Sequence, residues 1–135
     1  MRDTEHFKAS EFECKCGCGK NNVQQSLVDK LEILREQTGL PIVINSGCRC
    51  EEWNKKQGGA EQSPHPRGSA ADIKCPKINI MKFYAIVEQS GLFNRIGLSL
   101  YKKFIHVDIE EPIEPYICVR WWYNEKGGYV GEAWV

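Results

Sequence analysis

Three side chains in this sequence have the types and spacing of a catalytic metal site. His65 and Asp72 belong to residues 63–72, which read S-x-H-x-x-G-x-A-x-D. A catalytic Zn²⁺ takes three protein ligands and leaves one position open for water. His106 offers the third ligand from residues 104–109, where apolar and polar residues alternate with the period of a β-strand. The three residues therefore predict a zinc site.

The chemistry expected of such a site is metal-assisted hydrolysis. Zn²⁺ lowers the pKa of bound water toward neutrality and polarises a carbonyl oxygen, provided that its ligands are held rigidly. Gly68 permits a positive φ or a close backbone approach, and the alanines that follow it add little bulk. Each ligand also has a plain structural reading: a solvated His65, a turn-forming Asp72 and a core His106. Together they favour a shared cation, because a buried carboxylate and a buried imidazole both need partners.

A second carboxylate lies close to the last of these residues. Asp108 follows His106 by two positions, so the two side chains share one face of the predicted strand. We predict that Asp108 is catalytic as the base that activates the zinc water, or that it orients the imidazole of His106. Coordination of the metal by Asp108 is a third reading, and Glu110 or a loop residue is an alternative base.

Arg49 is the candidate for binding a substrate carboxylate. It follows a predicted strand over residues 42–46, and its planar guanidinium can hold a carboxylate through two hydrogen bonds. The alternative is a structural ion pair with Glu51 or Glu52. Other polar side chains near these segments could donate hydrogen bonds to a ligand or cap local backbone: Ser46, Gln62 and Ser63.

The elements that must position these residues are typical of a single α+β domain. Apolar residues at helical spacing predict a helix over residues 24–38 and another over 79–91, with a short helix around Trp53 followed by a long polar loop. We predict that the helices pack against a largely antiparallel sheet. Its strands are expected at residues 42–46, where the strand should be buried, 70–75, 95–100, 104–109 and 117–123, with a last strand ending near Trp134.

The composition fits one soluble domain spanning residues 1–135, in which residues 1–20 form a cysteine-rich N-terminal arm. The 18 basic and 18 acidic residues balance, and 41% of residues are hydrophobic. This composition favours neither nucleic acid nor an anionic membrane as a partner, and we expect a monomer. No signal peptide or membrane span is evident, so we expect the mature chain to begin near Met1. His6 has no evident partner and is expected to be solvated.

Seven cysteines are many for a chain of 135 residues, and an odd number cannot pair completely within one chain. Cys14, Cys16 and Cys18 alternate, so their side chains would point to one side of an extended segment, which suits a soft metal. Disulfides to the remaining cysteines are an alternative, as is a role as small buried apolar residues. Without a secretion signal we favour reduced thiols at synthesis. The remaining cysteines are Cys48, Cys50, Cys75 and Cys118.

Aromatic residues are concentrated near the C-terminus, at Trp121, Trp122, Tyr123 and Trp134. Aromatic residues in strands most often belong to the core. Trp122 is the candidate for a wall of the substrate groove, because sugars and peptides stack on indole.

The sequence resembles the zinc D-alanyl-D-alanine carboxypeptidases and related cell-wall peptidases that share the hedgehog-type metallopeptidase fold. The resemblance covers most of the chain. Its motifs occur in the family's order at residues 46–50 (SGCRC), 53–54 (WN), 58–60 (GGA), 63–72 and 106–108 (HVD). Residues 12–19, FECKCGCG, also resemble the small branch found in phage lysis proteins and bacterial wall-remodelling enzymes.

The resemblance implies a peptidase with one catalytic Zn²⁺ held by His65, Asp72 and His106, and with peptidoglycan stem peptides as its substrate. It also implies that Arg49 binds a substrate carboxylate. The cleaved bond would lie in the stem or the cross-link, through carboxypeptidase or endopeptidase action. A chain of this kind without a signal peptide would be made in the cytoplasm and act on the wall after phage-type release or through another export route.

The sequence departs from the family pattern at one place. Members commonly carry an acidic residue or a histidine two or three positions before the last zinc ligand, where this chain has Phe104 and Lys103. The alternative function is therefore a zinc-containing module that binds cell-wall fragments or a protein without cleaving them.

Overall fold

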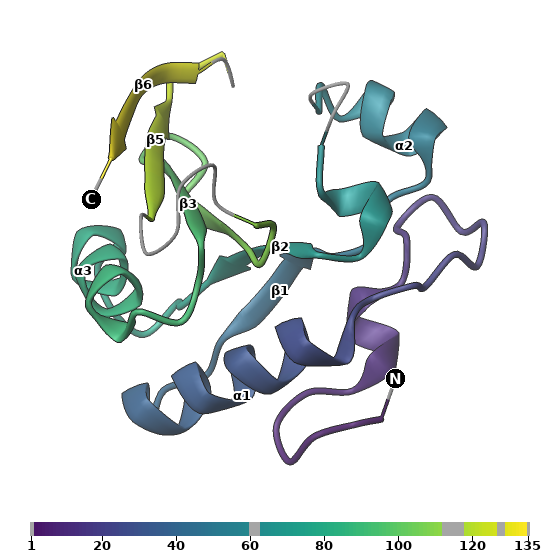
Figure 1. Ribbon diagram of the computed structural model, residues 1–135, viewed down its shortest axis with the longest axis horizontal. Coiled ribbons are helices and arrows are strands. Elements are labelled where there is room, and N and C mark those ends of the chain that lie inside the picture. The colour runs from purple at the N-terminus through teal and green to yellow at the C-terminus, as the bar shows by residue number, and fades with distance from the viewer. Residues whose placement is uncertain (1, 60–62, 112–117, 127–128, 135) are drawn as a thin grey trace.

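The structure of the protein is a computed structural model, which describes residues 2–59, 63–111, 118–126 and 129–134. Its strands in chain order are β1 (Val43–Ser46), β2 (Ala70–Lys74), β3 (Arg95–Ser99), β4 (Phe104–Asp108), β5 (Val119–Tyr123) and β6 (Tyr129–Trp134). They form one sheet in the order β1-β2-β4-β3-β5-β6 (Figure 1). Neighbouring strands run antiparallel except β3 and β5, which are parallel. The predicted α+β class with a largely antiparallel sheet is confirmed.

The helices begin and end where the sequence has capping residues. Asn79 accepts a hydrogen bond from the backbone of Met81 at the start of α3 (Ile80–Ser90), and Gly39 and Gly91 end α1 (Gln25–Thr38) and α3 with left-handed backbones. Among the described residues no helix combines the length and apolar character needed to cross a bilayer. The helices are α1 (Gln25–Thr38), α2 (Glu51–Lys56) and α3 (Ile80–Ser90), with short 3₁₀ turns η1 (Ala9–Phe12) and η2 (His65–Arg67).

The two faces of the sheet carry different kinds of side chain, because side chains alternate along each strand. On one face the apolar residues of the central strands join those of α1 and α3 in a single core, and Figure 1 shows both helices beside the sheet. On the other face Asp72 of β2 pairs in register with His106 of β4, which pairs with Gly97 of β3. Buried core residues include Leu27, Leu31, Ala71, Ile73, Phe83, Val87, Ile105 and Val107.

The prediction that β1 is a buried strand was wrong for one of its faces. Ile44 is 6% exposed, but Val43 is 46% exposed. The reason is that β1 lies at the edge of the sheet, next to β2 alone. A run of β-branched residues indicates a strand but does not say whether the strand is central.

The expectation that His6 lacks a partner was also wrong, although the residue is exposed, as expected of a solvated histidine. Its Nδ1 lies 2.6 Å from Oε2 of Glu32, and its backbone N–H donates to Oε1 of the same carboxylate at 2.7 Å. Glu32 is buried on α1, so these contacts attach the start of the N-terminal arm to that helix. The sequence separation of 26 residues explains why no local pattern revealed the pair.

The structure confirms both properties expected of Gly68, a positive φ and a close backbone approach. Its backbone is left-handed, with φ of 73°, and a Cβ at this position would overlap the backbone oxygen of Asn22. Its own carbonyl accepts a hydrogen bond from the backbone of Gln24 at 2.9 Å. The close approach packs the loop that carries His65 against the chain entering α1.

We expect Gly68→Ala to lower the free energy of unfolding by about 2–5 kcal/mol, because the left-handed strain of about 1–2 kcal/mol adds to a backbone overlap of about 1–3 kcal/mol. Gly39→Ala is the matched control, since Gly39 has φ of 66° and open space around its Cβ position. The Gly39→Ala control should be destabilised only by the left-handed strain, by about 1–2 kcal/mol. Urea unfolding of both variants measures the difference, and equal losses would contradict the role of the close approach.

Candidate metal centre

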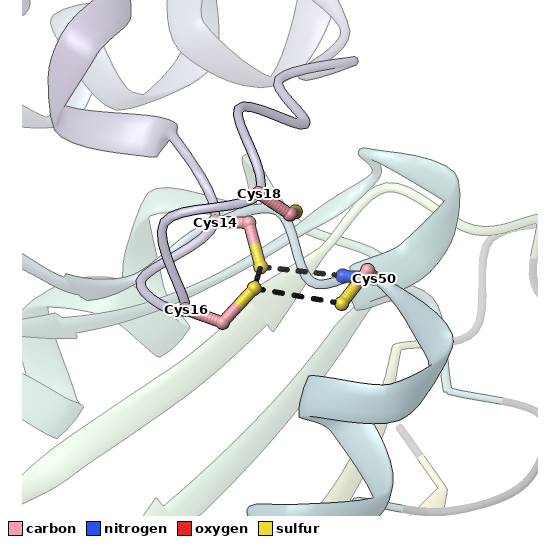
Figure 2. Close-up of side chains that lie close together, drawn as sticks. All are labelled: Cys14, Cys16, Cys18 and Cys50. Carbon is pink, nitrogen blue, oxygen red and sulfur yellow. Dashed lines mark hydrogen bonds between the residues drawn. The ribbon is translucent and has the colours of Figure 1, made fainter.

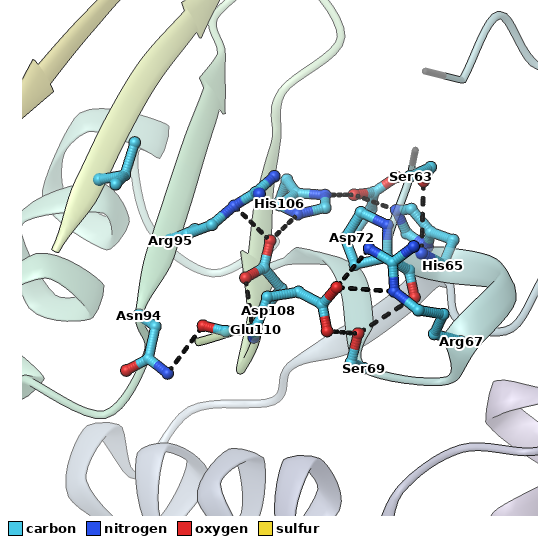
Figure 3. Close-up of polar contacts among 12 residues, drawn as sticks. Ser63, His65, Arg67, Ser69, Asp72, Asn94, Arg95, His106, Asp108 and Glu110 are labelled. Carbon is cyan, nitrogen blue, oxygen red and sulfur yellow. Dashed lines mark hydrogen bonds and ion pairs between the residues drawn. The ribbon is translucent and has the colours of Figure 1, made fainter. Parts of the chain in front are cut away.

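The structure brings His65, Asp72 and His106 together from η2, β2 and β4. Oδ1 of Asp72 lies 3.3 Å from Nε2 of His65 and 3.2 Å from Nδ1 of His106 (Figure 3). One ligand atom from each residue lies within 4.8 Å of the others. All three side chains are buried, with residue exposures of 2–4%. The segments that the sequence separates thus meet at one point on the face opposite the apolar core.

Each imidazole is oriented through its other nitrogen. Nδ1 of His65 donates to the backbone oxygen of Gly47 at 2.8 Å, so Nε2 is directed toward Asp72. Nε2 of His106 lies 2.7 Å from Oδ2 of Asp108, so Nδ1 is the nitrogen that faces Asp72. A carbonyl or carboxylate that fixes the second nitrogen of a histidine is the usual support of a metal ligand.

The donor set fits Zn²⁺. Two imidazole nitrogens and one carboxylate oxygen, held rigidly beside a cavity, make a three-ligand site with room for a fourth group. Burial raises the pKa of Asp72, but the charges of the two histidines and their hydrogen bonds outweigh this effect and hold the pKa well below its usual range. Burial lowers the pKa of His106, but hydrogen bonds and charges from Asp108 and Asp72 raise it to about 9. Both shifts have the same cause, which is the attraction between the buried carboxylates and the imidazoles beside them.

Asp108 lies on the far side of the His106 ring. Its side chain is fully buried, and its Oδ2 contacts Nε2 of His106 and, at 3.2 Å, Nε of Arg95 (Figure 3). The imidazole therefore separates this carboxylate from Asp72. Of the roles predicted for Asp108, this position suits an orienting group and does not suit a metal ligand or a base beside the metal.

Glu110, the alternative base, has other partners. Its carboxylate pairs with the guanidinium of Arg67 and accepts a hydrogen bond from Oγ of Ser69 at 2.9 Å. It does not line the cavity beside the three candidate ligands. These contacts connect the segment after β4 to the loop that carries His65, which is a structural role.

Arg49 lies beside the centre, held at three points. Its Nη2 is 3.1 Å from Oδ2 of Asp72, while Nη1 donates to Asn54 at 3.2 Å and Nε donates to Oγ of Ser46 at 3.1 Å. Its ion-pair partner is thus Asp72 and neither Glu51 nor Glu52. Ser46, a predicted substrate-binding residue, serves here to orient the guanidinium.

The other two predicted substrate-binding residues have different outcomes. Ser63 lines the cavity, and its Oγ accepts a hydrogen bond from the backbone of His65 at 3.3 Å, so it also supports the η2 turn. Gln62 lies outside the described residues.

The cavity over the centre has a volume of about 260 Å³ and a basic lining. Among the described residues that line it, Asp72 is the only carboxylate. A cavity of this charge favours an anionic ligand. Its basic residues are Arg49, Arg95, Lys102 and Lys126.

Sequence reasoning missed the part played by Trp121 and Arg95. Trp121 is 5% exposed, its ring centroid lies 5.1 Å from that of His106, and the guanidinium carbon of Arg95 lies 5.2 Å from the Trp121 centroid. Gly97 makes room for this indole, because a Cβ there would overlap it. The usable signal was strand alternation, which places Arg95 and Gly97 on one face.

The alternative in which Trp122 walls the groove was wrong, and the core role expected of these aromatic residues holds for Trp121, which is buried. Trp121 and Tyr123 line the cavity, whereas Trp122 points away and is 42% exposed. Successive residues of a strand face opposite sides, so the register of β5 with β3 decides which aromatics reach the site. The side chain of Trp134 lies outside what the structure describes.

Comparison with known proteins identifies the family. The family model described as Peptidase M15 matches residues 5–108, which extend from the N-terminal arm to the end of β4. A search of curated proteins found no match. The matched residues include the three candidate ligands and Arg49, and the match confirms the predicted membership of a zinc peptidase family. The chain therefore belongs to the peptidase M15 family of zinc metallopeptidases.

Proposed function

We propose that the protein hydrolyses a peptide bond in bacterial peptidoglycan, as a D-Ala-D-Ala carboxypeptidase or as an endopeptidase of the stem or cross-link. The observation that carries the proposal is the convergence of His65, Asp72 and His106 within 4.8 Å in a chain of the M15 family. A zinc ion bound by these residues would polarise the scissile carbonyl and lower the pKa of water. The protein's own side chains bind and orient the substrate around it.

The charge of the cavity supports peptidoglycan peptides as substrates. Stem peptides carry carboxylates, and a carboxylate that enters this cavity meets Arg49 together with Lys102 and Lys126. Ser46 and Asn54 hold Nε and Nη1 of Arg49, so the plane of the guanidinium is fixed before a ligand binds. Such preorganisation reduces the entropy cost of a bidentate contact. We assign Arg49 to the substrate carboxylate on this basis.

Asp108 acts in this proposal as a positioning residue. It accepts a hydrogen bond from His106 and balances the charge of Arg95, and the His106 ring keeps it from the reacting atoms. Its effect on hydrolysis passes through the orientation and basicity of the imidazole.

One observation favours the second candidate, a zinc module that binds wall fragments without cleaving them. Lys103 lies three positions before His106, in the turn between β3 and β4, where an acidic residue or a histidine would be expected of a catalytic member of the family. Its backbone has a positive φ of 55°. Asp72 is the sole carboxylate among the described residues of the cavity wall. Digestion of peptidoglycan by the purified protein, followed by mass spectrometry of the products, separates the two functions.

We expect Asp72→Ala to reduce peptidoglycan hydrolysis by at least about a thousandfold, because losing the ligand carboxylate removes several kcal/mol of transition-state stabilisation. Mass spectrometry of digested peptidoglycan measures the products and identifies the bond. Asp29→Ala, at an exposed position on α1, is the control and should match the unmodified protein. A chelator should abolish activity and zinc should restore it.

Full activity in a folded Asp72→Ala variant would remove the peptidase mechanism. Binding of muropeptides by the unmodified protein without any new amine would support the non-catalytic module instead.

We expect Asp108→Ala to weaken zinc binding about 10–100-fold, because His106 loses the acceptor that fixes its ring. Asp108→Asn should lose less, since its amide oxygen can still accept from Nε2. Competition against a chromophoric chelator measures the affinity, and kcat is measured at saturating zinc. A kcat loss of about a hundredfold or more at saturating zinc, in both variants, would show that Asp108 is the base after all.

We expect Arg49→Ala to raise KM for a peptide with a free carboxylate about 10-fold or more, which is the loss of a charge-assisted hydrogen bond of about 1.5–3 kcal/mol. Arg49→Lys should be intermediate, because an ammonium cannot make the bidentate contact. The control is the same peptide with its carboxylate converted to an amide, for which the unmodified protein and the variant should differ little. An equal loss on both peptides would assign Arg49 to support of Asp72 alone.

A further inference from the structure

A second group of potential ligands lies away from the catalytic centre. Cys14, Cys16 and Cys18 of the N-terminal arm meet Cys50, which precedes α2 (Figure 2). Sγ of Cys16 lies 3.5 Å from Sγ of Cys14 and 3.7 Å from Sγ of Cys50. All four sulfurs lie within 4.8 Å of one another. The cluster therefore joins two segments that are distant in sequence.

The separations fit a metal site better than disulfides. In a tetrahedral zinc–thiolate site with Zn–S bonds of about 2.3 Å, neighbouring sulfurs are about 3.8 Å apart, whereas a disulfide brings them to about 2.05 Å. The observed 3.5 Å and 3.7 Å are close to the edges of such a tetrahedron. Four sulfurs also saturate the coordination of zinc, as structural sites do.

Backbone amides around the cluster point at the sulfurs. The N–H of Cys50 donates to Sγ of Cys14 at 3.4 Å, and the N–H of Trp53 donates to Sγ of Cys50 at 3.4 Å. The N–H of Lys20 donates to Sγ of Cys18 at 3.5 Å. Amide donors of this kind stabilise thiolates, which are the form that binds a metal.

The chain between the cysteines turns the sulfurs inward, and polar contacts rather than apolar packing connect it to the rest of the fold, such as Lys20 Nζ donating to the carbonyl of Pro66 at 2.8 Å. Gly17 and Gly19 have positive φ of 87° and 85°, and the N–H of Cys14 donates to the carbonyl of Lys20 at 2.9 Å. Residues 15–22 contain no large apolar side chain, and Cys16 and Cys18 are exposed. A loop without a core of its own is commonly held by a metal or by cross-links.

We propose that Cys14, Cys16, Cys18 and Cys50 bind a second, structural Zn²⁺ ion as four thiolates, with no position left open for substrate. The ion would fasten the N-terminal arm to the start of α2, one residue after Arg49. The arm already meets this segment where the N–H of Cys48 donates to the carbonyl of Phe12 at 2.8 Å. The proposal does not depend on the bond that the enzyme cleaves, or on whether it cleaves one.

Zinc content tests the proposal directly. The protein is purified under reducing conditions with zinc, and bound metal is measured by mass spectrometry of the elements. We expect about two zinc ions per chain, falling to about one in the Cys16→Ser/Cys18→Ser variant and to about one in His65→Ala. Cys75→Ser/Cys118→Ser is the matched control, because these two cysteines lie outside the cluster, and it should retain both ions. A cluster variant that retains all the zinc of the unmodified protein would overturn the proposal.

The atoms that coordinate zinc can also be identified in the unmodified protein, so this test does not depend on whether a variant folds. X-ray absorption at the zinc edge of the unmodified protein should contain a sulfur shell at about 2.3 Å, and in His65→Ala this shell should dominate. A spectrum of the unmodified protein with nitrogen and oxygen neighbours alone would overturn the proposal. So would an intact mass, after purification without reductant in the presence of zinc, showing disulfides among the four cysteines. Neither reading uses hydrolysis, so the second site and the proposed function can fail separately.

Discussion

The buried carboxylate of Asp72 is the constraint on which the rest of the site depends. An ionised carboxylate removed from water is costly unless charges and hydrogen bonds replace its hydration. Here it is contacted by His65, His106 and Arg49, each supplied by a different segment of the chain. Those segments must meet for the fold to tolerate Asp72 in the middle of β2. The burial that gives the Asp72 carboxylate a high desolvation cost also makes it a strong ligand for a cation.

The polar contacts continue outward from Asp72 across the sheet. The backbone of Gly47 holds His65, Asp108 holds His106, and Arg95 connects Asp108 to the indole of Trp121. Each side chain therefore has its orientation set by the next, and such connected networks are stiffer than isolated pairs. Antiparallel pairing of β2, β4 and β3 places these residues on one face, while the opposite face is occupied by the apolar core.

Much of the fold could be predicted because its signals are local. Helical spacing in α1 and α3, glycine caps and strand alternation around His106 all act within a few residues. The candidate ligands were predictable for a related reason, since His65, Gly68 and Asp72 form a compact motif. The features that escaped prediction depend on contacts between distant segments. The pair of His6 with Glu32, the choice of Trp121 over Trp122 and the edge position of β1 follow from sheet order and register, which no short window of sequence contains.

The parallel pairing of β5 with β3 has a consequence for how the cleft can diversify. The family match ends at residue 108, and all three candidate ligands lie inside it, but Trp121 and Tyr123 reach the cavity from β5, which follows the matched residues. The candidate ligands and the aromatic part of the cavity wall thus lie in consecutive stretches of the chain. Substitutions in β5 can therefore alter the aromatic wall of the cavity without replacing any of the three candidate ligands.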